Sequence, residues 1–214
     1  MSNNILVIPD LHAPFIHPKA LKHCLKQYKR FKCNKVVFIG DVIDNAATTR
    51  WEANPDGYSP GDELKLAIKQ LSQWYSAFPK ATVVIGNHER RVLKKLTNSA
   101  VSKQWLKEFN QVLGVPNWEF VDDYELDGVR YIHGEGCSST IQSLLQSTTS
   151  LVFGHWHKKL ELVYNQNKFA MVVGCLTDET TYAFEYGRTY INKQILGCAV
   201  VLDNGKLPIL CPLQ

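Results

Sequence analysis

Five short blocks of this sequence place aspartate, asparagine or histidine directly after an apolar run. Carboxylate and amide oxygens, together with imidazole nitrogens, are ligands of hard and borderline divalent cations. Their recurrence predicts that several strands deliver such ligands to one edge of a sheet, as in a two-metal hydrolytic site. The blocks are Asp10-x-His12, Gly40-Asp41, Gly86-Asn87-His88-Glu89, His133, and Gly154-His155-Trp156-His157.

Spacing within two of the blocks suggests how their side chains share a site. In an extended segment, alternate side chains point to the same face. Asp10 and His12 would then face one site, and so would His155 and His157. Each residue also has a plainer structural role open to it, such as capping a segment for Asp10 or Asp41, or a hydrogen-bonded core position for His133.

The apolar runs before these blocks are typical of buried parallel strands, with helices between them. Residues 5–8, 36–39 and 82–85 are short and rich in β-branched side chains. A helix is expected after Pro18, and another after Ser59, which suits the N-cap position. A third, mostly helical segment is expected from residue 90 to about residue 113.

The chain becomes strand-rich after residue 116. Short apolar runs are separated by turn signals, with Asp127-Gly128 predicted to close a hairpin and Asp203-Asn204-Gly205 to separate the last two strands. An α/β first half and a β-rich second half predict two sheets packed face to face with helices outside. We expect one domain over residues 1–214.

Composition excludes some classes of protein. The formal net charge of +4 suits phosphorylated substrates but is weaker than the basic footprint of a dedicated nucleic-acid binder. Six cysteines without a C-x-x-C pair predict buried free thiols in a reducing cytoplasm. No apolar stretch approaches the roughly 20 residues of a membrane span. We therefore expect a cytoplasmic protein with no membrane anchor, in the host cytoplasm if the source is a bacteriophage.

The order of the blocks resembles that of the calcineurin-like metallophosphoesterases. That family's pattern is D-x-H, G-D-x-x-D, G-N-H-[DE], a single His, and G-H-x-H, and all five parts occur here in order between residues 10 and 157. The resemblance is to small bacterial and bacteriophage members. It implies an α/β fold of two mixed sheets, in four layers α/β/β/α, and a phosphoester hydrolase with two divalent cations.

The resemblance also implies a role for each matching residue. One ion would be held by Asp10, His12, Asp41 and His157, and the other by Asp41, Asn87, His133 and His155. Asp41 would bridge the ions, and a hydroxide between them would attack phosphorus in line. His88 would assist the leaving group with Asp44 orienting its imidazole, although a plain turn role remains open for Asp44. Manganese is the expected metal, with iron, zinc, magnesium and nickel as alternatives.

Arg90 and Arg91 follow Glu89 where a helix is expected to begin. Positive charge there opposes the helix macrodipole at a cost of about 0.3–1 kcal/mol. A role in binding the substrate phosphate would explain why two arginines occur at this position. We expect Arg90 and Asn87 to contact the substrate. The alternative is a surface pair of arginines facing Glu89 or solvent, which is preferred for Arg91.

Departures from the family pattern bear on the substrate. Asn45 stands where protein phosphatases of this superfamily carry an arginine, and the second histidine of the last block also differs from them. Glu89 is instead common among protein phosphatases. The first prediction is a phosphatase or phosphodiesterase acting on a small phosphoester or a nucleotide. A DNA or RNA nuclease is the alternative, and a non-catalytic scaffold is a third. The oligomeric state stays open.

Overall fold

Two mixed β-sheets form the centre of the computed structural model, which describes residues 2–48, 56–178, 180, 181 and 193–213. The first sheet has the strand order β11-β10-β1-β2-β3-β4, and the second has the order β5-β6-β7-β9-β8. The strands are β1 (Ile5–Ile8), β2 (Lys35–Phe38), β3 (Ala81–Val84), β4 (Trp118–Val121), β5 (Tyr124–Leu126), β6 (Val129–Ile132), β7 (Ser150–Phe153), β8 (Leu160–Asn165), β9 (Lys168–Val173), β10 (Gly197–Leu202) and β11 (Leu207–Pro212).

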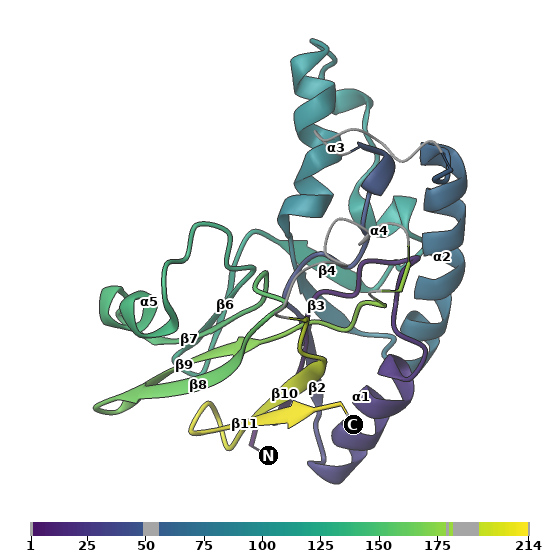
Figure 1. The fold of residues 1–214 in the computed structure, drawn as a ribbon. Helices are drawn as coiled ribbons and strands as arrows, with labels where there is room; N and C mark the ends of the chain where they lie inside the picture. The colour runs from purple at the N-terminus through teal and green to yellow at the C-terminus, as the bar shows by residue number, and fades with distance from the viewer. Residues whose placement is uncertain (1, 49–55, 179, 182–192, 214) are drawn as a thin grey trace.

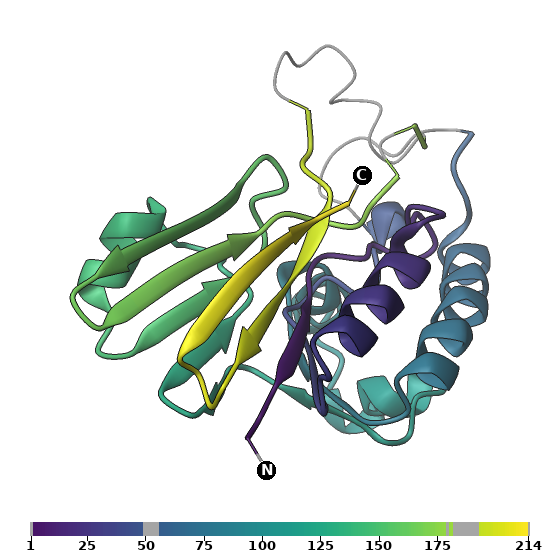
Figure 2. The same cartoon turned by 90° about the horizontal axis from the view of Figure 1, so that it is seen from below.

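Helices cover the outer faces of the sheet pair. Figure 2 shows α1 and α2 on one side of the two sheets and α5 on the other, and Figure 1 shows α3 standing away from the sheet ends. This four-layer arrangement confirms the predicted α/β fold with two packed sheets. The helices are α1 (Ala20–Arg30), α2 (Pro60–Ala77), α3 (Asn87–Asn98), α4 (Phe109–Val112) and α5 (Thr140–Gln146), with short 3₁₀ turns η1 (Ala46–Thr48) and η2 (Lys103–Trp105).

Strand β1 shows how the sequence builds these layers. Leu6 and Ile8 pack in the cluster under α1 and α2, whereas Ile5 and Val7 pack in the cluster between the sheets. All four side chains are fully buried. Burial of one such aliphatic side chain contributes about 1.5–3 kcal/mol. An apolar run therefore becomes a central strand because both of its faces are covered.

Parallel pairing brings the metal-ligand blocks to one edge. Strands β1, β2 and β3 run parallel in the first sheet, and β6 and β7 run parallel in the second. Their carboxyl ends therefore lie on one side of each sheet, and the hydrogen bond from Gly154 N to His133 O at 2.9 Å links the ends of the last two strands. Ligands of sheets of this type bind outside the carboxyl ends of the strands.

Local signals in the sequence are mostly confirmed. Ser59 caps α2 by accepting a hydrogen bond from Asp62 N at 3.2 Å. Asp127 and Gly128 both have positive φ, 54° and 73°, and join β5 to β6 as a two-residue hairpin. The third helical segment begins at Asn87, earlier than predicted, and is broken after residue 98.

The described cysteines and helices also bear on the expected cell biology. All six cysteines are free, and five of them are buried. Among the helices that the structure describes, none combines the length and apolarity needed to span a membrane.

Candidate metal centre

All the residues predicted as ligands or catalytic groups meet at the carboxyl ends of five strands. Each block lies in the turn or helix start directly after its strand, so residues separated by up to 147 positions become neighbours. Asp10 and His12 follow β1, Asp41 and Asp44 follow β2, and Asn87 and His88 follow β3. In the second sheet, His133 follows β6, and His155 and His157 follow β7.

Asp41 is shared by two groups of potential ligands. In one group, the ligand atoms of His12, Asp41 and His88 lie within 4.8 Å of one another, and in the other those of Asp41, His133 and His155 do. Asp41 Oδ2 lies 3.1 Å from His133 Nε2 and 3.7 Å from His12 Nε2. A single buried carboxylate therefore faces both groups.

The second group is completed by the asparagine of the third block. His133 Nδ1 faces the carbonyl oxygen of Ile39 at 2.9 Å, which turns Nε2 toward the centre. Asn87 Oδ1 lies 2.8 Å from that Nε2, and His155 Nδ1 lies 3.2 Å from it. A ring nitrogen anchored on backbone with the other directed at neighbouring ligands is the usual arrangement of a metal-binding histidine.

The remaining predicted ligands lie on the opposite side of Asp41. His12 Nε2 and His157 Nε2 are 3.2 Å apart. Asp10 Oδ2 lies 3.6 Å from His157 Nε2 and accepts the backbone N–H of His155 at 2.9 Å. The first and last blocks are therefore joined directly, although they come from different sheets.

His88 differs from His12 and His133 because the nearest partners of both its ring nitrogens, Asp44 and Arg91, are not predicted ligands. Its Nδ1 contacts the carbonyl oxygen of Asp44 and lies 3.3 Å from Asp44 Oδ1. Its Nε2 lies 2.8 Å from Arg91 Nη2. Asp44 also contacts His12 Nδ1 at 2.5 Å, so one carboxylate orients two imidazoles.

Backbone conformation, rather than strand alternation, aims several of these side chains. His12, Asp41 and His155 have φ values of 52°, 49° and 67°, in the left-handed region that few non-glycine residues adopt. The prediction that extended segments align Asp10 with His12 and His155 with His157 is therefore wrong. The chain turns at these positions because the sheets have ended, and each unusual residue carries about 1–3 kcal/mol of local strain.

Glycines in the blocks permit close approach to the carboxylates. A Cβ on Gly86 would lie 2.1 Å from Asp41 Oδ1 and 2.5 Å from Asp41 N. A Cβ on Gly154 would lie 2.9 Å from Asp10 Oδ1. These glycines are required for space, because any larger residue would displace a carboxylate of the centre.

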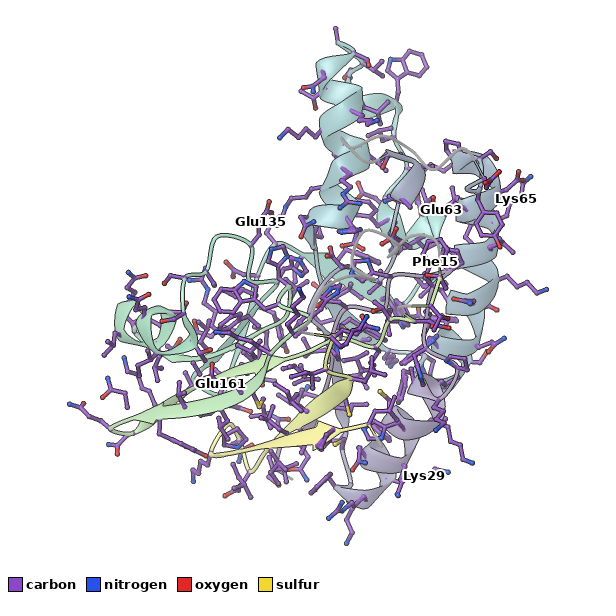
Figure 3. All side chains as sticks on the ribbon, in the orientation of Figure 1. Phe15, Lys29, Glu63, Lys65, Glu135 and Glu161 are labelled. Carbon is purple, nitrogen blue, oxygen red and sulfur yellow. The ribbon has the colours of Figure 1, made fainter. Side chains whose placement is uncertain are left out.

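Two buried glutamates, which no motif predicted as supporting residues, hold the loops around the centre. Glu89 accepts the backbone N–H of Gly86, Asp41 and Ile43, at 2.8, 3.0 and 3.2 Å. Glu63 of α2, labelled in Figure 3, accepts those of Ala46 and Ala47 at 2.8 and 3.0 Å. The alternative in which the two arginines pair with Glu89 is wrong, because the Glu89 side chain is fully buried and accepts backbone N–H groups instead.

The two arginines after Glu89 point in different directions. Arg90 Nη2 donates to Asp122 Oδ1 at 3.1 Å, and Arg90 Nη1 lies 3.8 Å from Glu135 Oε2. Arg91 instead reaches His88, and its Nη1 donates to the carbonyl oxygen of Asp44 at 3.2 Å. The predicted contact of Arg90 with substrate stays a prediction, but the geometry places Arg91 beside the candidate site.

Electrostatics at the centre are those of a cation site. Burial raises the pKa of the Asp10 carboxyl to about 8, despite the opposing attraction of His133. Burial would also raise the pKa of Asp41, but the imidazoles of His133 and His88 hold it well below its usual range. Burial acts to lower the pKa of His133, yet the Asp41 carboxylate raises it to about 10. His12, His155 and His157 have lowered pKa values, first because of burial.

The donor set fits divalent cations. Asp10 Oδ1 is buried and has no hydrogen-bond partner in the part of the chain that the structure describes, and its distance of 3.6 Å to His133 Nδ1 is too long for one. Imidazole nitrogens 3.2 Å apart, as in His12 and His157, need a proton or a cation between them. Oxygen and imidazole ligands shared through one carboxylate are consistent with a dinuclear site.

Family comparison agrees with this geometry. The model of the calcineurin-like phosphoesterases matches residues 4–168, well over half of the 214-residue chain. The chain therefore belongs to the calcineurin-like phosphoesterase family. A search of curated protein sequences gave no significant match.

Solved structures share the fold at low sequence identity. A metallophosphoesterase from Sphaerobacter thermophilus aligns over 100% of this chain and 89% of its own, with 12% identity and a TM-score of 0.54. The phosphoesterase Yfce from E. coli aligns over 92% and 87%, with 15% identity and a TM-score of 0.46. The nuclease MPE from Pseudomonas putida aligns over 98% and 87%, with 14% identity and a TM-score of 0.43. The first of these alignments shows that the chain shares the fold of a metallophosphoesterase.

Other predicted features lie at the border of the site. The segment between Gly134 and Ser139 leads into α5, whose first turn is capped by Ser139 accepting from Gln142 N at 3.2 Å. Arg50 and Trp51, in the connection between β2 and α2, lie outside the described residues. Tyr58, from the same connection, stacks on Phe15 with ring centroids 6.4 Å apart.

Proposed function

We propose that the chain is a single-domain phosphoester hydrolase, over residues 1–214, with two divalent cations at the centre. The observation that carries this proposal is the position of Asp41, whose carboxylate belongs to both groups of potential ligands. A bridging carboxylate is what a two-metal phosphoesterase requires. Manganese is the proposed metal because mixed oxygen and nitrogen ligands suit it, although iron, zinc, magnesium and nickel are compatible.

The proposed ligands extend the two groups with Asp10, His157 and Asn87 and leave out His88. Asp10, His12, Asp41 and His157 would hold one cation, and Asp41, Asn87, His133 and His155 the other. When bound, the two cations would polarise the phosphoryl oxygens and supply an activated water near neutral pH. Glu89 would keep Asp41 in position by accepting its backbone N–H.

His88 is proposed as the proton donor to the leaving oxygen rather than as a ligand, because the cationic guanidinium of Arg91 lies beside its Nε2. Asp44 contacts Nδ1 and would fix the tautomer and the direction of Nε2. Burial acts to lower the pKa of His88, but the carboxylates of Asp41 and Asp44 outweigh it and raise that pKa. A raised pKa favours the protonated imidazole that a general acid needs.

The test combines metal content with turnover. Purified protein loaded with Mn²⁺ should bind about two ions per chain and hydrolyse at least one of four substrates: a phosphomonoester, a bis-phosphodiester, a cyclic nucleotide, and single- or double-stranded DNA. Asp41→Ala should lose metal and activity together, whereas His88→Ala should retain metal and lose activity. Equal activity in wild type and Asp41→Ala would refute the two-metal proposal, and metal binding without turnover of any substrate would favour a scaffold.

A further inference from the structure

Arg91 lies close enough to the candidate metal centre to contact a negatively charged substrate. It belongs to the second turn of α3, four residues after Asn87. Its Nη2 lies 2.8 Å from His88 Nε2, and that Nε2 lies 3.7 Å from Asp41 Oδ2. The guanidinium is therefore one imidazole away from the carboxylate shared by the two groups.

The partners of Arg91 leave its charge uncompensated. They are an imidazole nitrogen of His88 and the carbonyl oxygen of Asp44, and among the described residues no carboxylate lies within 4.0 Å of the guanidinium. Arg90 on the same helix has two such carboxylates, Asp122 and Glu135. A half-buried arginine without a counter-anion, beside a hydrolytic centre, indicates that an anion completes its surroundings.

The contact between Arg91 and His88 also suggests where that anion would bind. A guanidinium can only donate hydrogen bonds, so His88 Nε2 accepts in this state. A leaving oxygen placed at His88 Nε2 would therefore lie beside the guanidinium of Arg91. The planar fork of the guanidinium could then bind two non-bridging oxygens of the same phosphoryl group.

Neighbouring polar groups do not supply an equivalent charge. The amide of Asn45, which follows Asp44, donates to His88 O at 3.0 Å and carries no charge. Arg90 is directed toward the loop of Glu135, which Figure 3 shows beyond the end of β6.

We infer that Arg91 grips the non-bridging oxygens of a phosphomonoester dianion, beside the leaving oxygen assigned to His88, and makes the enzyme prefer monoesters to diesters. This inference rests on the proposed phosphoesterase function. A monoester carries close to two negative charges at neutral pH, whereas a diester carries one and has fewer free oxygens. A second cationic donor therefore gains more from a monoester than from a diester.

The experiment compares Arg91→Ala and Arg91→Lys with Lys95→Ala, which removes one exposed positive charge from the same helix. Each Mn²⁺-loaded protein is assayed with p-nitrophenyl phosphate and with bis(p-nitrophenyl) phosphate. Arg91→Ala should lower kcat/KM roughly ten- to hundredfold for the monoester, the value of a lost charge-assisted hydrogen bond, and only about threefold for the diester. Arg91→Lys should be intermediate, and Lys95→Ala should match the wild type.

A second readout is independent of turnover. Inorganic phosphate should stabilise the Mn²⁺-loaded wild type in thermal melts, and Arg91→Ala should need about tenfold more phosphate for the same shift. Equal losses on both substrates would mean that Arg91 only positions His88, and would overturn the inference. So would a wild type that prefers the diester, a larger monoester effect in Arg90→Ala than in Arg91→Ala, or unchanged phosphate binding. A wild type that hydrolyses none of the four substrates named above would refute the proposed function, and phosphate binding alone would then decide the role of Arg91.

Discussion

Replacing Glu89 by glutamine tests whether this buried carboxylate links the backbone to the metal centre. Glu89 Oε2 accepts two N–H groups, from Gly86 and Asp41, and Oε1 accepts one, from Ile43. A glutamine can keep its oxygen at the first position only by presenting its NH₂ group to the N–H of Ile43. One hydrogen bond is then lost, and a buried donor is left without an acceptor.

The expected cost follows from that single exchange. Losing a hydrogen bond to a charged acceptor costs about 1.5–3 kcal/mol. Removing the negative charge near Asp41 offsets part of this, because burial and the Asp41 carboxylate raise the pKa of Glu89. We therefore expect Glu89→Gln to lower the free energy of unfolding by about 1–2 kcal/mol. Displacement of Asp41 should weaken Mn²⁺ binding by about 10- to 100-fold, as is typical when a group supporting a metal ligand is lost.

Glu63→Gln provides the matched control. Glu63 also accepts backbone N–H groups, from Ala46 and Ala47, but it does not contact Asp41. Urea unfolding of the ion-free proteins should show a loss of stability in both variants, whereas titration with Mn²⁺ should show weaker binding in Glu89→Gln alone. Unchanged Mn²⁺ affinity in Glu89→Gln, or an equal loss in Glu63→Gln, would refute the proposed link between this carboxylate and the centre.

Three further perturbations address other parts of the centre. Asp44→Asn should keep two bound ions but lower kcat by about 10- to 100-fold, because the imidazole that Asp44 orients loses its partner; unchanged kcat would contradict this role. Gly86→Ala should abolish tight Mn²⁺ binding, because its Cβ would lie 2.1 Å from Asp41 Oδ1; metal analysis showing two bound ions would disprove the steric argument. Metal affinity should rise with pH up to about 10, because the raised pKa values keep Asp10 protonated below about 8 and His133 protonated below about 10 without metal, and binding must release those protons. Calorimetry in buffers of different ionisation enthalpy would show no proton release if this is wrong.

The layered fold could be predicted because its signals are local. Each local signal determines a small piece of structure, as the Ser59 cap and the Asp127-Gly128 turn show. A short, wholly apolar run such as Ile5–Ile8 must form a strand that is buried on both of its faces. The blocks after the strands then meet because parallel strands end on the same side. The identity of the neighbours at the centre therefore follows from the order of the motifs.

The directions of individual side chains could not be predicted in the same way. The left-handed backbone at His12 and His155 depends on contacts with other loops, such as the hydrogen bond from His12 N to Asp41 O at 2.9 Å. Which of the two arginines, Arg90 or Arg91, faces the candidate site depends on the rotation of α3 about its own axis (its phase), since consecutive residues on a helix point about 100° apart. That phase is set where the helix begins, at Asn87, and motif spacing does not reveal it.

Asp41 explains why the fold and the centre are inseparable. Its carbonyl oxygen accepts the N–H of Leu11 and His12, at 3.0 and 2.9 Å, which connects the first block to the second. Its Oδ1 accepts the N–H of His88 at 2.9 Å, and its own N–H binds Glu89, which connects both to the third. Only Oδ2 faces the grouped imidazoles without a backbone donor. Replacement by alanine removes the ligand and the contact with His88 together, so Asp41→Asn is the sharper probe of charge, because its amide oxygen can still accept from His88 while the bridging charge is lost.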